Sequence, residues 1–210
     1  MSLTALLTLA DSRLPTGGHV HSGGVEDAVQ HGLLTDVVTV EAFLRRRIRT
    51  TGLVAAGLAA AACAGDELAV LDAEADARTP SPAQRAASRA QGRGLLRLAR
   101  STWPDSPWAG LGPRPHHPVA LGVVAAAAGL GRHDAALAAV YVTMTGSATA
   151  AQRLLALDPG QVAACTLQLS ALCDEVAELS CAQGLPADSD PLLDLLAERH
   201  ALRRNTLFAS

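Results

Sequence analysis

Long runs of small apolar residues dominate this chain and restrict the folds open to it. Residues 53–64 and 119–128 are rich in alanine, and residues 135–151 are almost uniformly apolar. Although 49% of the chain is hydrophobic, only 2% is aromatic, so Ala, Leu and Val have to build the core. These residues suit close packing of helix on helix better than a pleated sheet. The sequence therefore predicts an all-α fold with residues 53–64 and 135–151 in its interior.

The length of 210 residues is enough for one sizeable core. We expect residues 1–210 to form a single all-helical domain, a bundle of roughly eight to ten helices. No apolar run reaches the length of a membrane span, and the first residues lack the charge and cleavage pattern of a signal peptide. We therefore expect a cytoplasmic protein that does not bind a membrane.

Cysteine spacing argues against a metal site or a disulfide. Cys165, Cys173 and Cys181 recur at intervals of eight within one predicted helix, and Cys63 lies far away in the sequence. Neighbours eight residues apart on a helix are separated by about 12 Å, which is too far for one ion or one S–S bond. We expect all four to pack as small hydrophobic side chains.

Local signals place one helix start clearly. Ser81-Pro82-Ala83-Gln84 has Ser at the N-cap, Pro at the first helical position and Gln three residues after the cap, and predicts a helix to about residue 101. Residues 103–118 contain five prolines, so no helix is expected there. The charged stretch 66–77 is typical of a surface helix.

The complete absence of lysine excludes two kinds of enzyme. All 17 basic residues are arginine. A phosphate-binding loop that ends in Gly-Lys-Ser/Thr and a Schiff-base site both need the lysine amine itself. The chain is therefore not expected to hydrolyse nucleotides itself. Its net charge of −3 provides no general attraction for nucleic acid.

A glycine-rich polar segment near the amino terminus interrupts the helical pattern. Its Ser22 is not preceded by glycine at position 20, as a hydrolase nucleophile elbow requires, and two histidines leave a tetrahedral metal half-coordinated. We interpret the segment as a shaped backbone turn that packs helix ends and presents a surface to partners, while a transient nickel contact stays open. The residues singled out are Asp11, Pro15, Gly17, Gly18, His21, Ser22, Gly24 and Glu26.

Five arginines form a second candidate surface. Arg85, Arg89, Arg93 and Arg97 lie four residues apart, with Arg100 three further on, so they follow one drifting ridge of a helix. Three interpretations stay open: a solvated face, a docking surface for an acidic protein, and a DNA-binding surface of an all-helical regulator.

Two weaker patterns remain. The adjacent pair His116-His117 could bind a metal, although neighbouring histidines rarely chelate one ion well. Hydroxyl groups at Thr143, Thr145, Ser147 and Thr149 interrupt the most apolar helix. They are expected to bond to carbonyls one turn earlier, with a water-lined path or a dimer contact as the alternatives.

Three sequence blocks resemble one known family in content and order. Pro15-Thr16-Gly17-Gly18 followed by His21-Ser22-Gly23-Gly24-Val25-Glu26 is similar to the amino-terminal signature of the urease accessory protein UreF family. Ser88-Arg89-Ala90-Gln91-Gly92-Arg93, continuing to Arg97, resembles the central helix of that family. His116-His117-Pro118 with the following alanine run resembles its third block.

This resemblance implies a non-catalytic scaffold without a cofactor of its own. Proteins of this family are helical homodimers that bridge the UreD/UreH partner to the nickel-binding GTPase UreG. The assembly inserts nickel into apo-urease in a GTP-dependent manner, and the GTP is bound by the partner. Ser88, Gly92, Arg93 and Arg97, with the amino-terminal motif, are then candidate partner-binding or structural residues, and none is expected to be catalytic.

Overall fold

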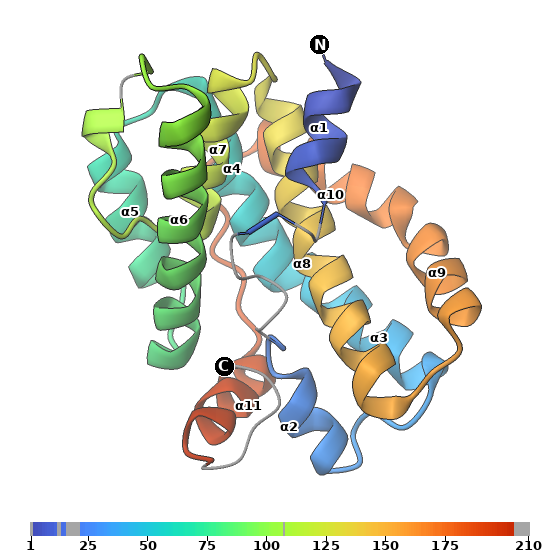
Figure 1. Ribbon diagram of the computed structural model, residues 1–210. Coiled ribbons are helices and arrows are strands. Elements are labelled where there is room, and N and C mark those ends of the chain that lie inside the picture. The colour runs from blue at the N-terminus through green and yellow to red at the C-terminus, as the bar shows by residue number, and fades with distance from the viewer. Residues whose placement is uncertain (1, 12–13, 16–21, 107, 204–210) are drawn as a thin grey trace.

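The computed structural model describes residues 2–11, 14–15, 22–106 and 108–203, and these residues fold into α helices without a strand (Figure 1). The all-α prediction is confirmed. Eleven α helices are present in the described part of the chain; α3 continues through the π-helical turn η2 into α4, and a single residue separates α9 from α10. The elements are α1 (Leu3–Leu9), α2 (Val25–Gln30), α3 (Val37–Arg47), η2 (Ile48–Gly52), α4 (Leu53–Ala64), α5 (Leu68–Ala77), α6 (Pro82–Thr102), the 3₁₀ turn η3 (Trp108–Gly110), α7 (His117–Ala127), α8 (Arg132–Leu155), α9 (Pro159–Gln168), α10 (Ser170–Ala182) and α11 (Pro191–Ala201).

Side-chain caps explain several helix starts. Asp36 caps α3 by accepting a hydrogen bond from the Thr39 amide at 2.8 Å, while the Thr39 hydroxyl accepts one from the Asp36 amide at 3.1 Å. Ser81 caps α6 as predicted, accepting from the Gln84 amide at 3.1 Å. The Gln84 side chain does not complete a capping box; its Nε2 donates to the Leu193 carbonyl on α11 instead.

Helices α4 and α8 form the centre of the molecule, as their apolar sequences predict (Figure 1). One hydrophobic cluster contains α2, α3, α9, α10 and α11, and a second contains α1, α5, α6 and α7. Both central helices contribute to each cluster from opposite faces: Ala56 and Ala60 of α4 belong to the first, and Leu58 and Ala59 to the second. The two halves of the core are therefore joined through α4 and α8.

Small residues allow the central helices to approach very closely. A Cβ atom at Gly122 of α7 would lie 2.3 Å from the carbonyl oxygen of Ala59 and 2.7 Å from Cβ of Ala62, both on α4. Contacts this short do not occur between real atoms, so the α4–α7 crossing requires glycine at this position.

Three sequence predictions need correction. The predicted single helix that carries three cysteines is two helices, α9 and α10, because the chain bends at Leu169. The proline-rich stretch 103–118 is not free of helix: it contains the turn η3, and α7 begins at His117. Helix α5 lies only partly on the surface, because Leu71 and Ala75 are buried.

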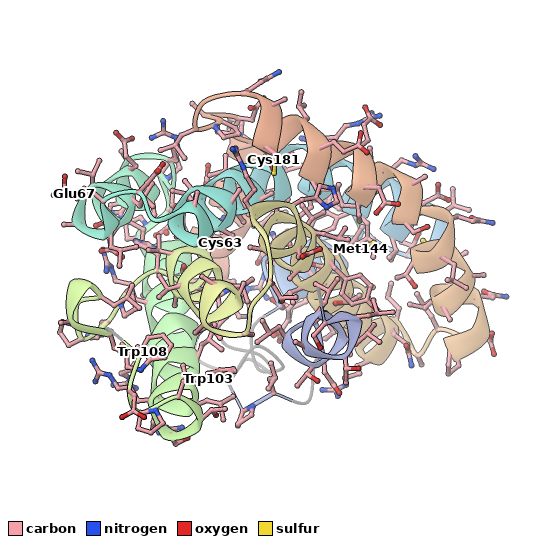
Figure 2. All side chains as sticks on the ribbon, turned by 90° about the horizontal axis from the view of Figure 1, so that it is seen from above. Cys63, Glu67, Trp103, Trp108, Met144 and Cys181 are labelled. Atoms are coloured by element: carbon pink, nitrogen blue, oxygen red, sulfur yellow. The ribbon has the colours of Figure 1, made fainter. Side chains whose placement is uncertain are left out.

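The four cysteines are free thiols, and Cys165 and Cys173 are buried as predicted. The Cys173 thiol lies 3.8 Å from the sulfur of Met144, which is labelled in Figure 2. Cys63 and Cys181 are half-buried, and the Cys63 thiol donates to the Leu130 carbonyl at 3.5 Å. Burial raises the pKa of the Cys63, Cys165 and Cys173 thiols, which keeps them protonated and unreactive.

Among the described residues, none of the helices is both long enough and apolar enough to cross a bilayer.

Replacement of Gly122 tests the helix crossing. Gly122→Ala is expected to lower the free energy of unfolding by roughly 1–3 kcal/mol, because the added methyl group overlaps the α4 backbone. Gly146→Ala in α8 is the matched control: nothing lies within 4 Å of the place that its Cβ would take, so it is expected to gain up to about 1 kcal/mol of helix propensity. Urea denaturation followed by circular dichroism measures both, and two changes of the same sign would contradict the proposed contact.

Candidate functional site

The amino-terminal polar motif leads into α2 through two glycines with positive φ. Gly23 has φ +60° and Gly24 has φ +88°, a backbone conformation that strongly favours glycine. A Cβ atom at Gly24 would lie 3.3 Å from Cβ of Leu196 on α11. The described part of the motif therefore shapes the backbone and packs two helix ends together, as the glycine pattern predicts.

Glu26 of this motif is buried and faces the last helix. Its Oε2 lies 2.9 Å from Nε2 of His200, and both residues are 1% exposed. The neighbouring Asp27 is also buried, with Nη2 of Arg203 at 2.5 Å and Nε of Arg199 at 3.7 Å. A buried acid needs such partners, so this charged seam fixes α2 against α11.

The other predicted residues of the motif are placed as follows. Ser22 is buried and its hydroxyl has no hydrogen-bond partner among the described residues, Pro15 is exposed, and Asp11 lines a cavity described below. Gly17, Gly18 and His21 lie outside the described residues.

A second polar cluster joins α5, α6 and α7 around His116. Its Nε2 lies 2.9 Å from Asp76 and its Nδ1 lies 3.0 Å from the Ser88 hydroxyl, while its backbone amide donates to Asp72 at 2.8 Å. Arg89 completes the cluster by donating to both Asp72 and Asp76. Each of the three helices thus contributes at least one charged or hydrogen-bonding group.

The Ser88–His116–Asp76 alignment differs from a hydrolase triad. In a triad the acid binds Nδ1 and the serine faces Nε2, whereas here the two ring nitrogens are used the other way round. The Ser88 oxygen also accepts the His117 amide at 3.1 Å, and His116 is only 1% exposed. With all of these polar atoms paired, the arrangement serves as a clamp between helices.

Burial keeps both histidines of this region neutral near pH 7. Burial lowers the pKa of His116, although Asp76 acts in the opposite direction. Burial alone lowers the pKa of His117 to about 4. A metal site at His116-His117, for which the sequence gives only a weak pattern, is not supported, since the described residues contain no group of three or more His, Cys, Asp or Glu arranged to hold an ion.

A cavity of about 530 Å³ lies beside the His116 cluster and the amino-terminal motif. Its wall includes His117, Ser88 and residues of α4, α6, α8 and α11. The four hydroxyl residues of α8, namely Thr143, Thr145, Ser147 and Thr149, all line it. Thr143 and Thr145 donate to the Ala139 and Tyr141 carbonyls one turn earlier, as predicted. The hydroxyl pattern therefore serves the helix backbone and also makes one wall of the cavity polar.

The structure divides the predicted arginine ridge of α6. Arg85 donates to the Thr79 and Pro80 carbonyls, and Arg89 belongs to the His116 cluster. The remaining three, Arg93, Arg97 and Arg100, are exposed and form no ion pair with any described residue. The outward basic surface is therefore about half as long as the sequence predicts, which removes part of the basis for a DNA-binding regulator.

Gly92 of α6 is a structural residue. A Cβ atom there would lie 2.0 Å from the Pro115 carbonyl oxygen and 3.0 Å from the backbone of His116. Glycine lets the loop before α7 cross α6, so Gly92 brings Ser88 and His116 together.

Comparisons with known proteins agree with this arrangement. A family model described as UreF matches residues 34–170. The urease accessory protein UreF of Mycobacterium sp. (strain JLS) is 63% identical over 211 residues, which cover 100% of this chain and 99% of the relative. The proteins of the same name from Mycolicibacterium vanbaalenii and Mycobacterium bovis (strain BCG / Pasteur 1173P2) are each 62% identical, again over 100% of this chain and 99% of the relative. This chain belongs to the UreF family of urease accessory proteins.

The amino-terminal motif lies outside the range matched by the UreF family model, although the full-length relatives cover it. The two helices of the charged seam also lie outside that range, α2 before it and α11 after it. The family assignment therefore rests on the helical body as well as on the motif that first suggested it.

Sequence reasoning missed several residues of the site. Asp72 and Asp76 lie four residues apart in α5, a spacing that puts both carboxylates on one helix face, although the charge pattern of this stretch predicts a solvated surface. His200 gave no local signal, because its partner Glu26 is 174 residues away.

The histidine environment predicts acid sensitivity in this UreF-family chain. Because the pKa of His117 is lower in the folded state than the ordinary value of about 6.5, the unfolded chain binds more protons between these values, so stability falls as the pH drops from 6.5 towards 4. His117→Gln is expected to reduce this loss by on the order of 1 kcal/mol between pH 7 and pH 5. Urea denaturation at both pH values measures it. The exposed His133→Gln is the control, and an unchanged pH dependence in His117→Gln would refute the assignment.

Proposed function

We propose that this UreF-family chain is a non-catalytic scaffold for nickel insertion into apo-urease. It holds a UreD/UreH partner and the GTPase UreG in register, and GTP binding and hydrolysis take place on UreG. The absence of lysine supports this division, since the chain lacks the residue that a phosphate-binding loop uses on its nucleotide. Nickel is the cargo of this assembly, and the scaffold role requires no resident ion.

The basic face of α6, a helix without Asp or Glu, is the observation that most supports this proposal. The helix contains five arginines and no Asp or Glu in 21 residues, although the whole chain has 20 acidic residues. Arg93, Arg97 and Arg100 project from it without an acidic neighbour in the described part of the chain. Such a surface favours docking of an acidic protein, because rim charges steer association and fix register.

Exposed apolar residues support homodimer formation as part of the proposal. Leu3 and Leu7 lie four residues apart on α1 and are 59% and 63% exposed. Helix α1 packs on α8, where Tyr141 is also exposed. Apolar side chains on adjacent helices are typical of surfaces that bind another protein, and a second copy is the occupant that we propose.

Deletion of the gene in a urease-positive host tests the function. We expect urease activity and urease-bound nickel to fall together while the amount of apo-urease stays the same, with both restored by a plasmid copy. The tagged chain should also co-purify with a GTPase and with urease subunits from cytoplasmic extract. Normal nickel content in the deletion strain would overturn the proposal, and salt-sensitive binding to duplex DNA without such partners would favour the regulator.

Charge reversal on α6 tests the docking surface in the same host. Arg93→Glu with Arg97→Glu is expected to leave the melting temperature nearly unchanged, because both side chains are exposed, and to reduce partner recovery and urease activity roughly tenfold. Arg49→Glu is the matched control, an exposed arginine of η2. Equal losses in the control and in the α6 variant would show that the effect is not specific to this surface.

A further inference from the structure

Three consecutive arginines end α3, and only two of them have an acidic partner among the described residues. Arg45 pairs with Glu41 on the same helix at 2.7 Å. Arg46 donates from Nε and Nη2 to the two carboxylate oxygens of Asp190, at 2.8 and 2.7 Å. Arg47 donates from Nη1 to the Gly23 carbonyl at 2.9 Å and forms no ion pair with a carboxylate of the described residues. Its charge is therefore not neutralised by this part of the chain.

Arg47 is half-buried. Burial lowers its pKa to about 10, so it stays protonated at neutral pH. Its Nε is enclosed and has no hydrogen-bond acceptor within the described ranges. Burying a cation without a counter-ion is costly, and such groups in proteins are normally paired.

A second unsatisfied donor lies next to the same backbone segment. The hydroxyl of Ser22 is enclosed without a partner in the described part of the chain, and Ser22 immediately precedes Gly23, whose carbonyl binds Arg47. Buried polar atoms in proteins nearly always have partners, so the unpaired Nε of Arg47, a residue that lines the cavity, indicates a missing acceptor there.

The helix geometry places Arg47 at the cavity. The π-helical turn η2 begins directly after Arg47, and π turns occur often at functional sites. Within it Ile48 is fully buried, while Arg47 and Thr51 line the cavity of about 530 Å³. This volume is in the range of small-molecule sites.

Four aspartates also line the cavity, namely Asp11, Asp188, Asp190 and Asp194. Asp190 is taken by Arg46, and Asp194 accepts from Nε2 of Gln84 at 3.3 Å. Burial raises the pKa of Asp194. A cationic ligand near Arg47 would be repelled, whereas an anion would supply the missing charge.

We propose that this cavity binds a small oxyanion, either a carboxylate or an inorganic oxyanion, with Arg47 as its counter-ion. Charge-assisted hydrogen bonds from a planar guanidinium match the oxygens of such a group. The site goes beyond the scaffold role, because it needs no partner protein.

Binding to the full-length chain tests this site. Isothermal titration with acetate, sulfate and inorganic phosphate, at constant ionic strength set with chloride, is expected to show saturable binding of at least one probe, which also raises the melting temperature. Arg47→Gln is expected to weaken that binding tenfold or more, since it removes a charge-assisted contact. Arg45→Gln, an exposed neighbour paired with Glu41, should bind as the unmodified chain does.

The outcomes separate the proposal from general salt effects. Equal affinity in Arg47→Gln and the unmodified chain would overturn it, as would the absence of saturable binding of all three probes at millimolar concentrations. If Arg47→Gln does not fold, Arg47→Lys provides the second test: it keeps the positive charge, loses the planar guanidinium fork and is expected to weaken binding several-fold. The measurement uses the isolated chain, so its failure would leave the urease experiments unaffected, and failure of those experiments would leave this site unaffected.

Discussion

The close contact between α4 and α7 is the constraint on which the remaining structure depends. The carbonyl of Ala59 occupies the space that a side chain at position 122 would fill, so the two helices touch backbone to backbone. Alanine-rich helices bury little surface per side chain, but at this separation many weak dispersion contacts act together. The same small side chains let α4 pack against α7, α8 and α10 at once. A larger residue at the crossing would displace both halves of the core, because α4 contributes to each.

Outside this centre, polar clamps also fix helices relative to one another. The His116 cluster joins α5, α6 and α7, Arg46–Asp190 joins α3 to the start of α11, and Glu26–His200 joins α2 to α11. Such pairs give directional contacts that apolar side chains cannot, and they specify one register between helices. At the carboxyl-terminal end of α6 an indole makes a local contact: Nε1 of Trp108 in η3 donates to the carbonyl of Trp103, the C-cap of α6, at 2.8 Å, and the two residues lie together at the edge of the molecule in Figure 2.

The local part of this architecture was predictable, and the long-range part was not. The Ser81 cap and the interior position of residues 53–64 follow from residue type and spacing. The bend at Leu169 did not follow, because the apolar seam of α9 and α10 continues across it without a glycine or proline. The charge pattern was the least reliable predictor of side-chain environment. Arg85 and Arg97 follow the same regular spacing, yet Arg85 donates to backbone carbonyls and Arg97 is exposed to solvent. Only tertiary neighbours distinguish such positions.

Helices α2 and α11, which are far apart in the sequence, meet near the uncompensated charge (Figure 1). Gly24 packs against Leu196 of α11, while Leu193 and Ala197 of the same helix line the cavity that Arg47 enters. Arg46 and Arg47 then reach in two directions from one helix end: Arg46 holds Asp190 before α11, and Arg47 holds the Gly23 carbonyl before α2. Because Arg46 and Arg47 belong to one turn of α3, a change in the surroundings of either guanidinium acts on α2 and α11 together. An anion bound beside Arg47 would reduce the cost of its burial and thereby favour the arrangement in which these helices are joined.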